Sequence, residues 1–370
     1  MIDRRTVLAL ALSSAVSSGM PPARAAEGAP GLGALAAARG LRFGAAVTAR
    51  QLSSMPDLAK AIERECSILV AEGEMKWHVV EHTRGKRDTK GADAIVAYAT
   101  ERGKAMRGHT LVWPAKGRLP AWIENWPDGE ANDLEAALVA HVTEMAGRYR
   151  GRIESWDVVN EGIEARDGRA DGLRRSVLLD RFDERYFDIA FTAARAADPG
   201  ARLAYNDYGI EHEIPWQVAK RRHVLDLLQR LVRRGVPVDT LGIQSHLTAS
   251  ETFDAAAFGR FLDEVAALGL AIEITELDVD DRRLPPAIED RDRATADLVR
   301  RYLGTCVARP AVRTVLTWGL SDRTSWINDP RWGRRRADGL PSRPLPLDET
   351  LARKPMWHAI AAAIAKAPAR

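Results

Sequence analysis

The segment VLDLLQRLVRRGVPVDTLGIQSH, residues 224–246, contains the structural unit from which the fold can be predicted. Its first part places apolar side chains at positions 224, 227, 228 and 231, the i, i+3, i+4, i+7 spacing of a helix with one buried face. Gly235 predicts the end of this helix, and the apolar run at residues 240–246 predicts a strand. A helix followed at once by a strand is the repeating unit of a parallel sheet.

The same alternation recurs along the chain. Helical patterns at residues 187–194 and 258–265 end at a breaker and precede apolar runs at residues 202–206 and 270–278. Five further predicted strands lie at residues 43–47, 67–70, 106–112, 153–160 and 314–318. Eight parallel strands on a chain of 370 residues predict an α/β fold, a closed (β/α)8 TIM barrel in one domain. An open doubly wound sheet is the alternative.

Charge and composition narrow the possible partners. Lys plus Arg number 54 against 51 Asp plus Glu, and a net charge of +3 is too small to predict a nucleic-acid partner. The two cysteines, Cys66 and Cys306, provide neither a disulfide framework nor a metal cluster. The chain has 10 tryptophans, whose flat apolar faces suit ring-shaped ligands. We expect no metal and no cofactor.

Two glutamates stand at the carboxyl ends of predicted strands. Glu161 ends the run WDVVNE, and Glu276 lies within ITELD. Strands of a barrel point their carboxyl ends to one mouth, so the two carboxyl groups are expected to face each other there. Cleavage of a glycosidic bond needs such a pair, one protonated to release the leaving oxygen and one ionised to act at the anomeric carbon.

Polar neighbours accompany this pair. Because side chains alternate along a strand, Gln244 shares a face with His246, and Glu276 shares one with Asp278. A relay from Asp278 through His246 to Glu276 is therefore geometrically plausible.

Six motifs in order resemble glycoside hydrolase family 10, the endo-β-1,4-xylanases. They are GHTLVW at residues 108–113, WDVVNE at 156–161, YNDY at 205–208, GIQSH at 242–246, ITELD at 274–278, and WGLSD at 318–322 with Trp326. The resemblance covers about residues 40 to 365. It implies a retaining endo-β-1,4-xylanase that hydrolyses internal bonds of xylan.

The resemblance also implies roles for single residues. Glu161 would be the acid/base and Glu276 the nucleophile. Asn160 would bond the sugar 2-hydroxyl, and Gln244 would steady Glu161. His246 with Asp278 would orient Glu276. The positions that match substrate-binding residues are Glu72, Lys76, His109, Trp113, Tyr208, Trp318 and Trp326.

The chain departs from the family pattern at two positions. Gly73 stands where the family usually has an asparagine that grips the distal sugar, and Pro114 replaces a histidine after Trp113. The basic run at residues 331–336 around Trp332 is expected to be a solvated loop, with a rim that touches acidic side groups of xylan as the alternative.

Two other functions stay open at this stage. One is a retaining glycosidase on another β-1,4-glycan, such as cellulose or mixed-linkage glucan. The other is a barrel that binds saccharides without cutting them, against which the presence of both glutamates argues. We expect the protein to act as a monomer.

The N-terminus predicts export. Arg4 and Arg5 precede an apolar run at residues 7–16, and Ala23-Arg24-Ala25 has the form of a cleavage site. The adjacent arginines resemble the twin-arginine type of signal. We expect a signal peptide at residues 1–25 and the catalytic domain at residues 26–370, without a membrane anchor after cleavage. The protein would then be periplasmic or extracellular.

Overall fold

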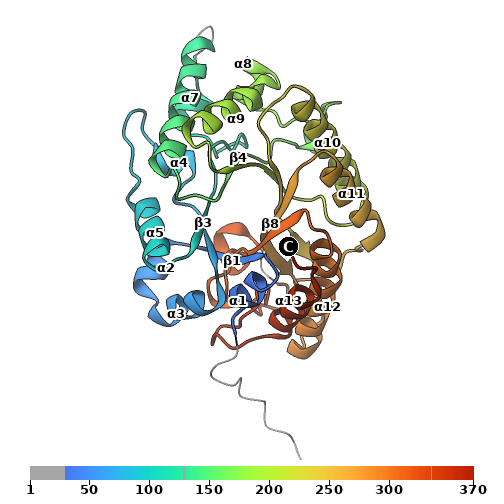
Figure 1. Cartoon of the computed structure of the whole chain (residues 1–370). Coiled ribbons are helices and arrows are strands. Elements are labelled where there is room, and N and C mark those ends of the chain that lie inside the picture. Colours follow the sequence, from blue (N-terminus) through green and yellow to red (C-terminus); the bar gives the residue numbers. More distant parts are fainter. Residues whose placement is uncertain (1–29, 128–130, 335) are drawn as a thin grey trace, which may run out of the picture.

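The computed structural model describes residues 30–127, 131–334 and 336–370. Eight parallel strands form the barrel: β1 (Arg42–Val47), β2 (Ile68–Ala71), β3 (Ala105–Gly108), β4 (Ser155–Asn160), β5 (Arg202–Asp207), β6 (Thr240–Ile243), β8 (Ala271–Asp280) and β9 (Val312–Thr317). Pairing of β1 with β9 and of β6 with β8 closes the sheet, with the helices arranged around it (Figure 1). The predicted (β/α)8 barrel is confirmed.

Two strands end clearly earlier than predicted. The run at residues 240–246 is divided into β6 and a short strand β7 (His246–Thr248), because Ser245 takes a left-handed backbone with φ 64°. Beyond this break, β7 pairs only with the extended end of β8. Strand β3 ends at Gly108, although the amides of Leu111 and Val112 still donate to carbonyls of β4.

The helices follow the predicted alternation. They are α1 (Leu32–Ala37), α2 (Ala49–Ser54), α3 (Pro56–Glu65), α4 (Trp77–Val80), α5 (Lys90–Glu101), α6 (Ala121–Glu124), α7 (Ala131–Arg148), α8 (Val177–Phe182), α9 (Arg185–Ala197), α10 (Pro215–Arg233), α11 (Ala255–Ala267), α12 (Ile288–Val307) and α13 (Pro355–Lys366). Four 3-10 turns are η1 (Ala165–Asp167), η2 (Asp322–Thr324), η3 (Trp326–Asn328) and η4 (Pro330–Trp332). The three predicted helical patterns lie in α9, α10 and α11. Across the described ranges, no helix combines the length and apolar character needed to cross a membrane.

Helix α11 shows how the sequence sets these elements. Asp254 caps its first turn by accepting hydrogen bonds from the amides of Ala256 and Ala257. The predicted apolar face is buried against the barrel, and each fully buried side chain of this size contributes about 1.5–3 kcal/mol. Gly269, with φ 82°, then turns the chain into β8, a backbone conformation that favours glycine.

A buried ionic network crosses the barrel interior. The Arg107 guanidinium on β3 donates to both carboxylate oxygens of Asp157 on β4, and its Nε donates to Glu273 on β8 at 2.9 Å. All three side chains are almost fully buried. Removing one partner of such a buried network would leave an unpaired charge and cost about 3–5 kcal/mol.

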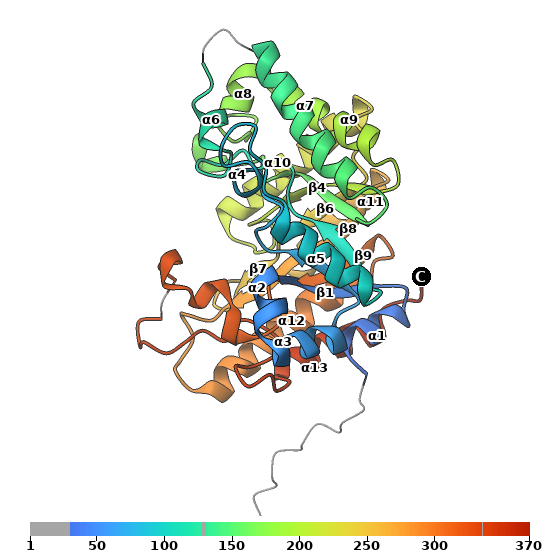
Figure 2. The ribbon, with the colours of Figure 1, turned by 90° about the vertical axis from the view of Figure 1, so that its left-hand side faces the viewer.

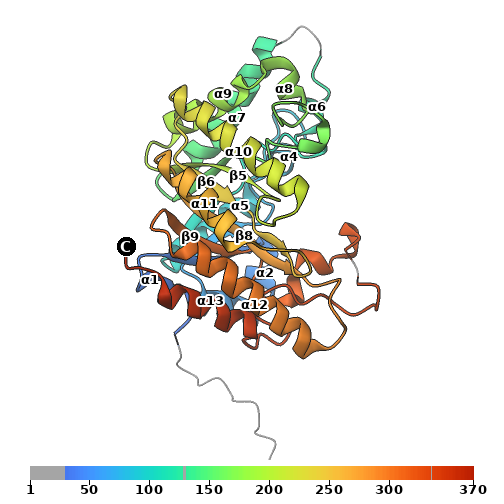
Figure 3. The ribbon, with the colours of Figure 1, turned by 90° about the vertical axis from the view of Figure 1, so that its right-hand side faces the viewer.

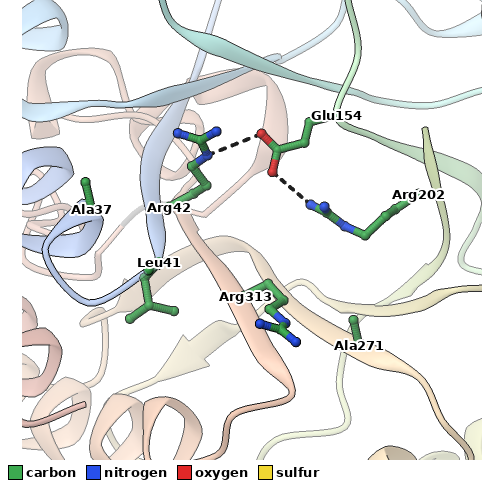
Figure 4. A pocket seen from close by; sticks show the side chains of 8 residues that line it. Ala37, Leu41, Arg42, Glu154, Arg202, Ala271 and Arg313 are labelled. Carbon is green, nitrogen blue, oxygen red and sulfur yellow. Dashed lines mark hydrogen bonds and ion pairs between the residues drawn. The ribbon is translucent and has the colours of Figure 1, made fainter. Parts of the chain in front are cut away.

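The two ends of the barrel differ. Where the strands begin, Glu154 accepts hydrogen bonds from Arg42 at 3.2 Å and Arg202 at 3.0 Å beside a pocket of about 560 Å³ (Figure 4). The segment between β9 and α13 projects on the side of the molecule opposite the C-terminus (Figures 2 and 3). It therefore belongs to the end at which the strands finish.

The cysteines are structural. Cys66 and Cys306 are both free and buried. Burial raises the pKa of the Cys66 thiol to about 12, so this group stays protonated and unreactive at neutral pH.

Gly108 offers a test of packing inside the barrel. A Cβ at this position would lie 2.0 Å from the Trp156 ring, so Gly108→Ala should overpack the interior and cost at least about 1–3 kcal/mol. Gly304→Ala is the matched control, because Gly304 lies in α12 with no atom within 4 Å of its added Cβ. Calorimetry should show a lower Tm only for Gly108→Ala, and equal Tm values would contradict this account.

Candidate active site

A cleft of about 510 Å³ lies where the barrel strands end. The predicted site residues that line it are Glu72, Lys76, His109, Trp113, Asn160, Glu161, Tyr208, Gln244, His246, Glu276, Trp318 and Trp326. Asp278 is buried directly behind His246. The barrel therefore brings together residues from the ends of most of its strands.

Glu161 follows the last residue of β4. Its backbone has φ 57°, a left-handed conformation that is uncommon outside glycine and occurs often at functional sites. One carboxyl oxygen accepts a hydrogen bond from Trp113 Nε1 at 2.9 Å, and the other accepts one from Gln244 Nε2 at 3.1 Å. Arg174 Nε donates to the Glu161 carbonyl at 2.6 Å and anchors the backbone.

Glu276 is buried on β8 at the end of a hydrogen-bonded chain. Its Oε2 lies 3.3 Å from His246 Nε2, and His246 Nδ1 lies 2.8 Å from Asp278 Oδ1. The second oxygen of Asp278 accepts a hydrogen bond from Trp326 Nε1 at 2.6 Å. The sequence of contacts predicted from Asp278 through His246 to Glu276 is thus present.

Two amide side chains connect the two carboxylates. Asn206 Nδ2 donates to Glu276 at 2.9 Å and to Asn160 Oδ1 at 2.8 Å. Gln244 Nε2 donates to Glu161 and, at 3.3 Å, to the same oxygen of Asn160. The Asn160 amide is therefore held by its oxygen, while its Nδ2 is buried with no hydrogen-bond partner in the described part of the chain.

Comparison with known proteins identifies the family. The model of Glycosyl hydrolase family 10 matches residues 31–363. The chain belongs to glycosyl hydrolase family 10. The resemblance seen in the sequence motifs is thereby confirmed.

Similar proteins cover most of this family 10 chain. Endo-1,4-beta-xylanase A of Fusarium oxysporum f. sp. lycopersici is 35% identical over 296 residues, which span 77% of this chain and 85% of the relative. Endo-1,4-beta-xylanase 1 of Humicola insolens is 30% identical over 90% of this chain and 73% of the relative.

Solved structures agree with the fold. Native xylanase 10B from Thermotoga maritima has a TM-score of 0.80 and 31% identity, covering 91% of this chain and 98% of that chain. Xylanase 10B from Thermotoga petrophila RKU-1, in complex with xylobiose, has a TM-score of 0.80 and 30% identity, covering 91% and 97%.

The electrostatics of this family 10 site separate its titratable groups. Burial alone would raise the pKa of Glu276, but the hydrogen bond from His246 and nearby positive charges lower it to about 2. Burial alone would lower the pKa of His246, whereas the Asp278 carboxylate raises it to about 10. Glu276 is therefore ionised and His246 charged at neutral pH.

Lys76, Glu72 and His109 form one side of the cleft. Lys76 Nζ lies over the rings of Trp113 and Trp318, 5.0 and 5.7 Å from their centroids. Burial lowers the pKa of Lys76 and raises that of Glu72. His109 Nδ1 lies 2.8 Å from Asp157 Oδ2, so the buried interior network also holds this ring.

The two departures from the family pattern differ in their surroundings. A Cβ on Gly73 would have no atom within 4 Å, so this position is open toward solvent. Pro114 is buried and stands in the loop that follows β3. The departure at Gly73 therefore leaves open space, whereas the departure at Pro114 lies in a packed loop.

Some residues of the site were not predicted. Asn206 stands in the YNDY motif at the end of β5. Its position at the carboxyl end of a predicted strand could have marked it as a site residue. Arg174 lies in a long loop after β4, and no local pattern indicates that it reaches Glu161. Asp157, which bonds both Arg107 and His109, resembles any buried polar residue of a strand.

His246 provides a test of the electrostatics. His246→Asn removes a positive charge and a charged hydrogen bond from Glu276, so the pKa of Glu276 should rise by about one to two units. Carbon-13 NMR of the Glu276 carboxyl group should show no titration near neutral pH in the folded wild type. In the variant, the titration midpoint of this group should lie at a higher pH than in the wild type. His82→Asn, on the exposed surface, is the control and should leave the titration unchanged. An unshifted Glu276 in His246→Asn would contradict the assignment.

Proposed function

We propose that this family 10 hydrolase is a retaining endo-β-1,4-xylanase, in which Glu161 is the acid/base and Glu276 the nucleophile. The observation that carries the proposal is the pair of glutamates, one directly after β4 and one within β8, joined by shared amide contacts and set in a cleft with tryptophan walls. The names of the relatives support xylan as the substrate.

The environments of the two carboxyl groups suit different roles. Glu276 is ionised and held by hydrogen bonds from Asn206 and His246 to both of its oxygens, which fits a nucleophile oriented before substrate binds. Glu161 receives hydrogen bonds from the uncharged N–H groups of Trp113 and Gln244. Its cationic neighbour, Arg174, lies 3.5 Å from the carboxylate.

In the first step, a carboxylate oxygen of Glu276 bonds to the anomeric carbon while the glycosidic C–O bond breaks. Glu161 gives its proton to the leaving oxygen, which departs as a hydroxyl group of the shortened chain. In the second step, Glu161 takes a proton from water, and the water oxygen displaces Glu276 from the anomeric carbon. Two displacements on one carbon restore the original anomeric configuration.

Other side chains would position the sugars. The free Nδ2 of Asn160 is a buried donor beside both glutamates, which suits a bond to the sugar 2-hydroxyl. Glu72, Lys76 and His109 would bind the non-reducing side of the chain. Tyr208, Trp113, Trp318 and Trp326 would provide the walls against which sugar rings pack.

We also propose that the protein is exported. The predicted signal peptide at residues 1–25 lies outside the described residues, and the described domain begins soon after it. Export by a twin-arginine-type route would place a monomeric enzyme in the periplasm or outside the cell, where it would meet a polymeric substrate.

Hydrolysis assays test the proposed substrate. The mature chain should release xylo-oligosaccharides from glucuronoxylan and arabinoxylan and cut cellulose far more slowly, because Trp318 and Trp326 crowd the place of the extra hydroxymethyl group of glucose. Proton NMR of the first products should show the β-anomer. Equal rates on cellulose would indicate a broader β-1,4-glycanase, an inverted product would exclude the double displacement, and binding without turnover would indicate a saccharide-binding barrel.

Substitution of the two glutamates tests their roles. Glu276→Ala should abolish turnover of every substrate, because no other group can form the glycosyl intermediate. Glu161→Ala should lose about 10²–10⁴-fold on xylan but still react with an aryl β-xylobioside, whose leaving group needs little protonation. Azide should then replace water in the second step and give a β-glycosyl azide. Equal losses for both variants on the aryl substrate would contradict the assignment.

A further inference from the structure

Two arginines of the cleft place their guanidinium groups over tryptophan rings. The Arg118 guanidinium is 4.6 Å from the centroid of Trp113 and 5.2 Å from that of Trp332. The Arg334 guanidinium is 4.3 Å from the centroid of Trp326. Stacking holds a guanidinium plane in place and leaves its N–H edges free to donate.

Neither guanidinium has an acidic partner in the part of the chain that the structure describes. Within residues 30–127, 131–334 and 336–370, no side-chain hydrogen bond or ion pair involves the guanidinium of Arg118 or Arg334. Neighbouring arginines differ in this respect. Arg331 pairs with Asp329, and Arg166 pairs with Glu164 at 2.7 Å. The cleft thus presents two positive charges that no described side chain pairs with.

These arginines stand close to the reacting groups. The ring under Arg118 belongs to Trp113, whose Nε1 donates to Glu161. The ring under Arg334 belongs to Trp326, whose Nε1 donates to Asp278.

Trp332 completes the surface between the two arginines. Its ring meets that of Trp326 edge to face at 5.7 Å and is 45% exposed. Arg118, Trp332, Trp326 and Arg334 therefore form a continuous surface along the cleft, which we name the arginine rim.

We propose that the arginine rim binds the carboxylate of an acidic sugar substituent carried by the xylan chain. This inference rests on the proposed function and specifies its substrate class as a uronic-acid-substituted xylan. A neutral chain offers nothing to pair with these charges, whereas a carboxylate accepts two parallel N–H bonds from one guanidinium. The pyranose ring of the substituent can pack on the exposed face of Trp332.

The position of Arg334 corrects part of the expectation that residues 331–336 form a solvated loop. Arg331 fits the solvated loop, because its side chain is 85% exposed and paired within the loop. Arg334, three residues later, instead lines the cleft.

A matched pair of polymers tests the proposal. Glucuronoxylan and the same polymer with its carboxyl groups reduced to hydroxymethyl groups differ only in the charge of the side group. For Arg118→Gln and Arg334→Gln, the ratio of kcat/KM on the acidic polymer to that on the reduced polymer should fall about three- to tenfold each, mainly through KM. Arg334→Lys should keep part of the preference for the acidic polymer, because lysine retains the positive charge but lacks the two parallel N–H donors of a guanidinium.

Arg331→Gln is the control from the same loop and should leave this ratio at the wild-type value. Raising the ionic strength from about 0.02 to 0.5 M should reduce the preference of the wild type, because salt screens exposed charges. If the arginines only stabilise the loops, both polymers should be affected equally in the variants, and that result would overturn the proposal.

Affinity electrophoresis separates this inference from the proposed function. Retardation in gels that contain either polymer measures binding without turnover. Stronger retardation by the acidic polymer, lost in Arg118→Gln and Arg334→Gln, would support the rim even if the protein proved inactive on xylan. Equal retardation by both polymers would reject the rim even if xylan hydrolysis were established.

Discussion

Closure of the sheet between β1 and β9 and between β6 and β8 is the constraint on which the rest of the structure depends. Parallel pairing throughout means that every strand finishes at the same end of the barrel. Glu161 and Glu276 belong to strands separated by β5 and β6, and only a closed barrel makes these strand ends face a common cleft. An open sheet would place the same two residues along one edge, without a surrounding wall.

Closure also creates an interior in which charges must be paired. Asp157 receives hydrogen bonds from Arg107 and contacts His109, so one carboxylate serves both the stability of the barrel and the orientation of a cleft residue. The same low-polarity surroundings strengthen the interaction of Glu276 with His246. A lowered pKa for Glu276 and a raised pKa for His246 are two descriptions of this single ion pair.

Tryptophans connect this chemistry to the surface of the cleft. Trp113 and Trp326 each use the indole N–H to hold a carboxylate and the ring face to support a guanidinium. These two tryptophans thus contact both the carboxylates of the site and the arginines that we propose bind charged substituents. Changes at the rim are therefore expected to alter specificity while the hydrogen bonds to Glu161 and Asp278 remain.

The sequence by itself predicted the barrel and placed two glutamates at its mouth, because apolar periodicity and alternation along a strand are local properties of the chain. It also indicated the family, since six motifs occur in order. Only the tertiary structure decided that β6 breaks at Ser245 and that Asn206 and Arg174 reach the glutamates. It also decided that Arg118 and Arg334 have no acidic partner among the described residues. Each of these facts depends on which residues from distant segments meet at the barrel mouth, and no local pattern of side chains records that.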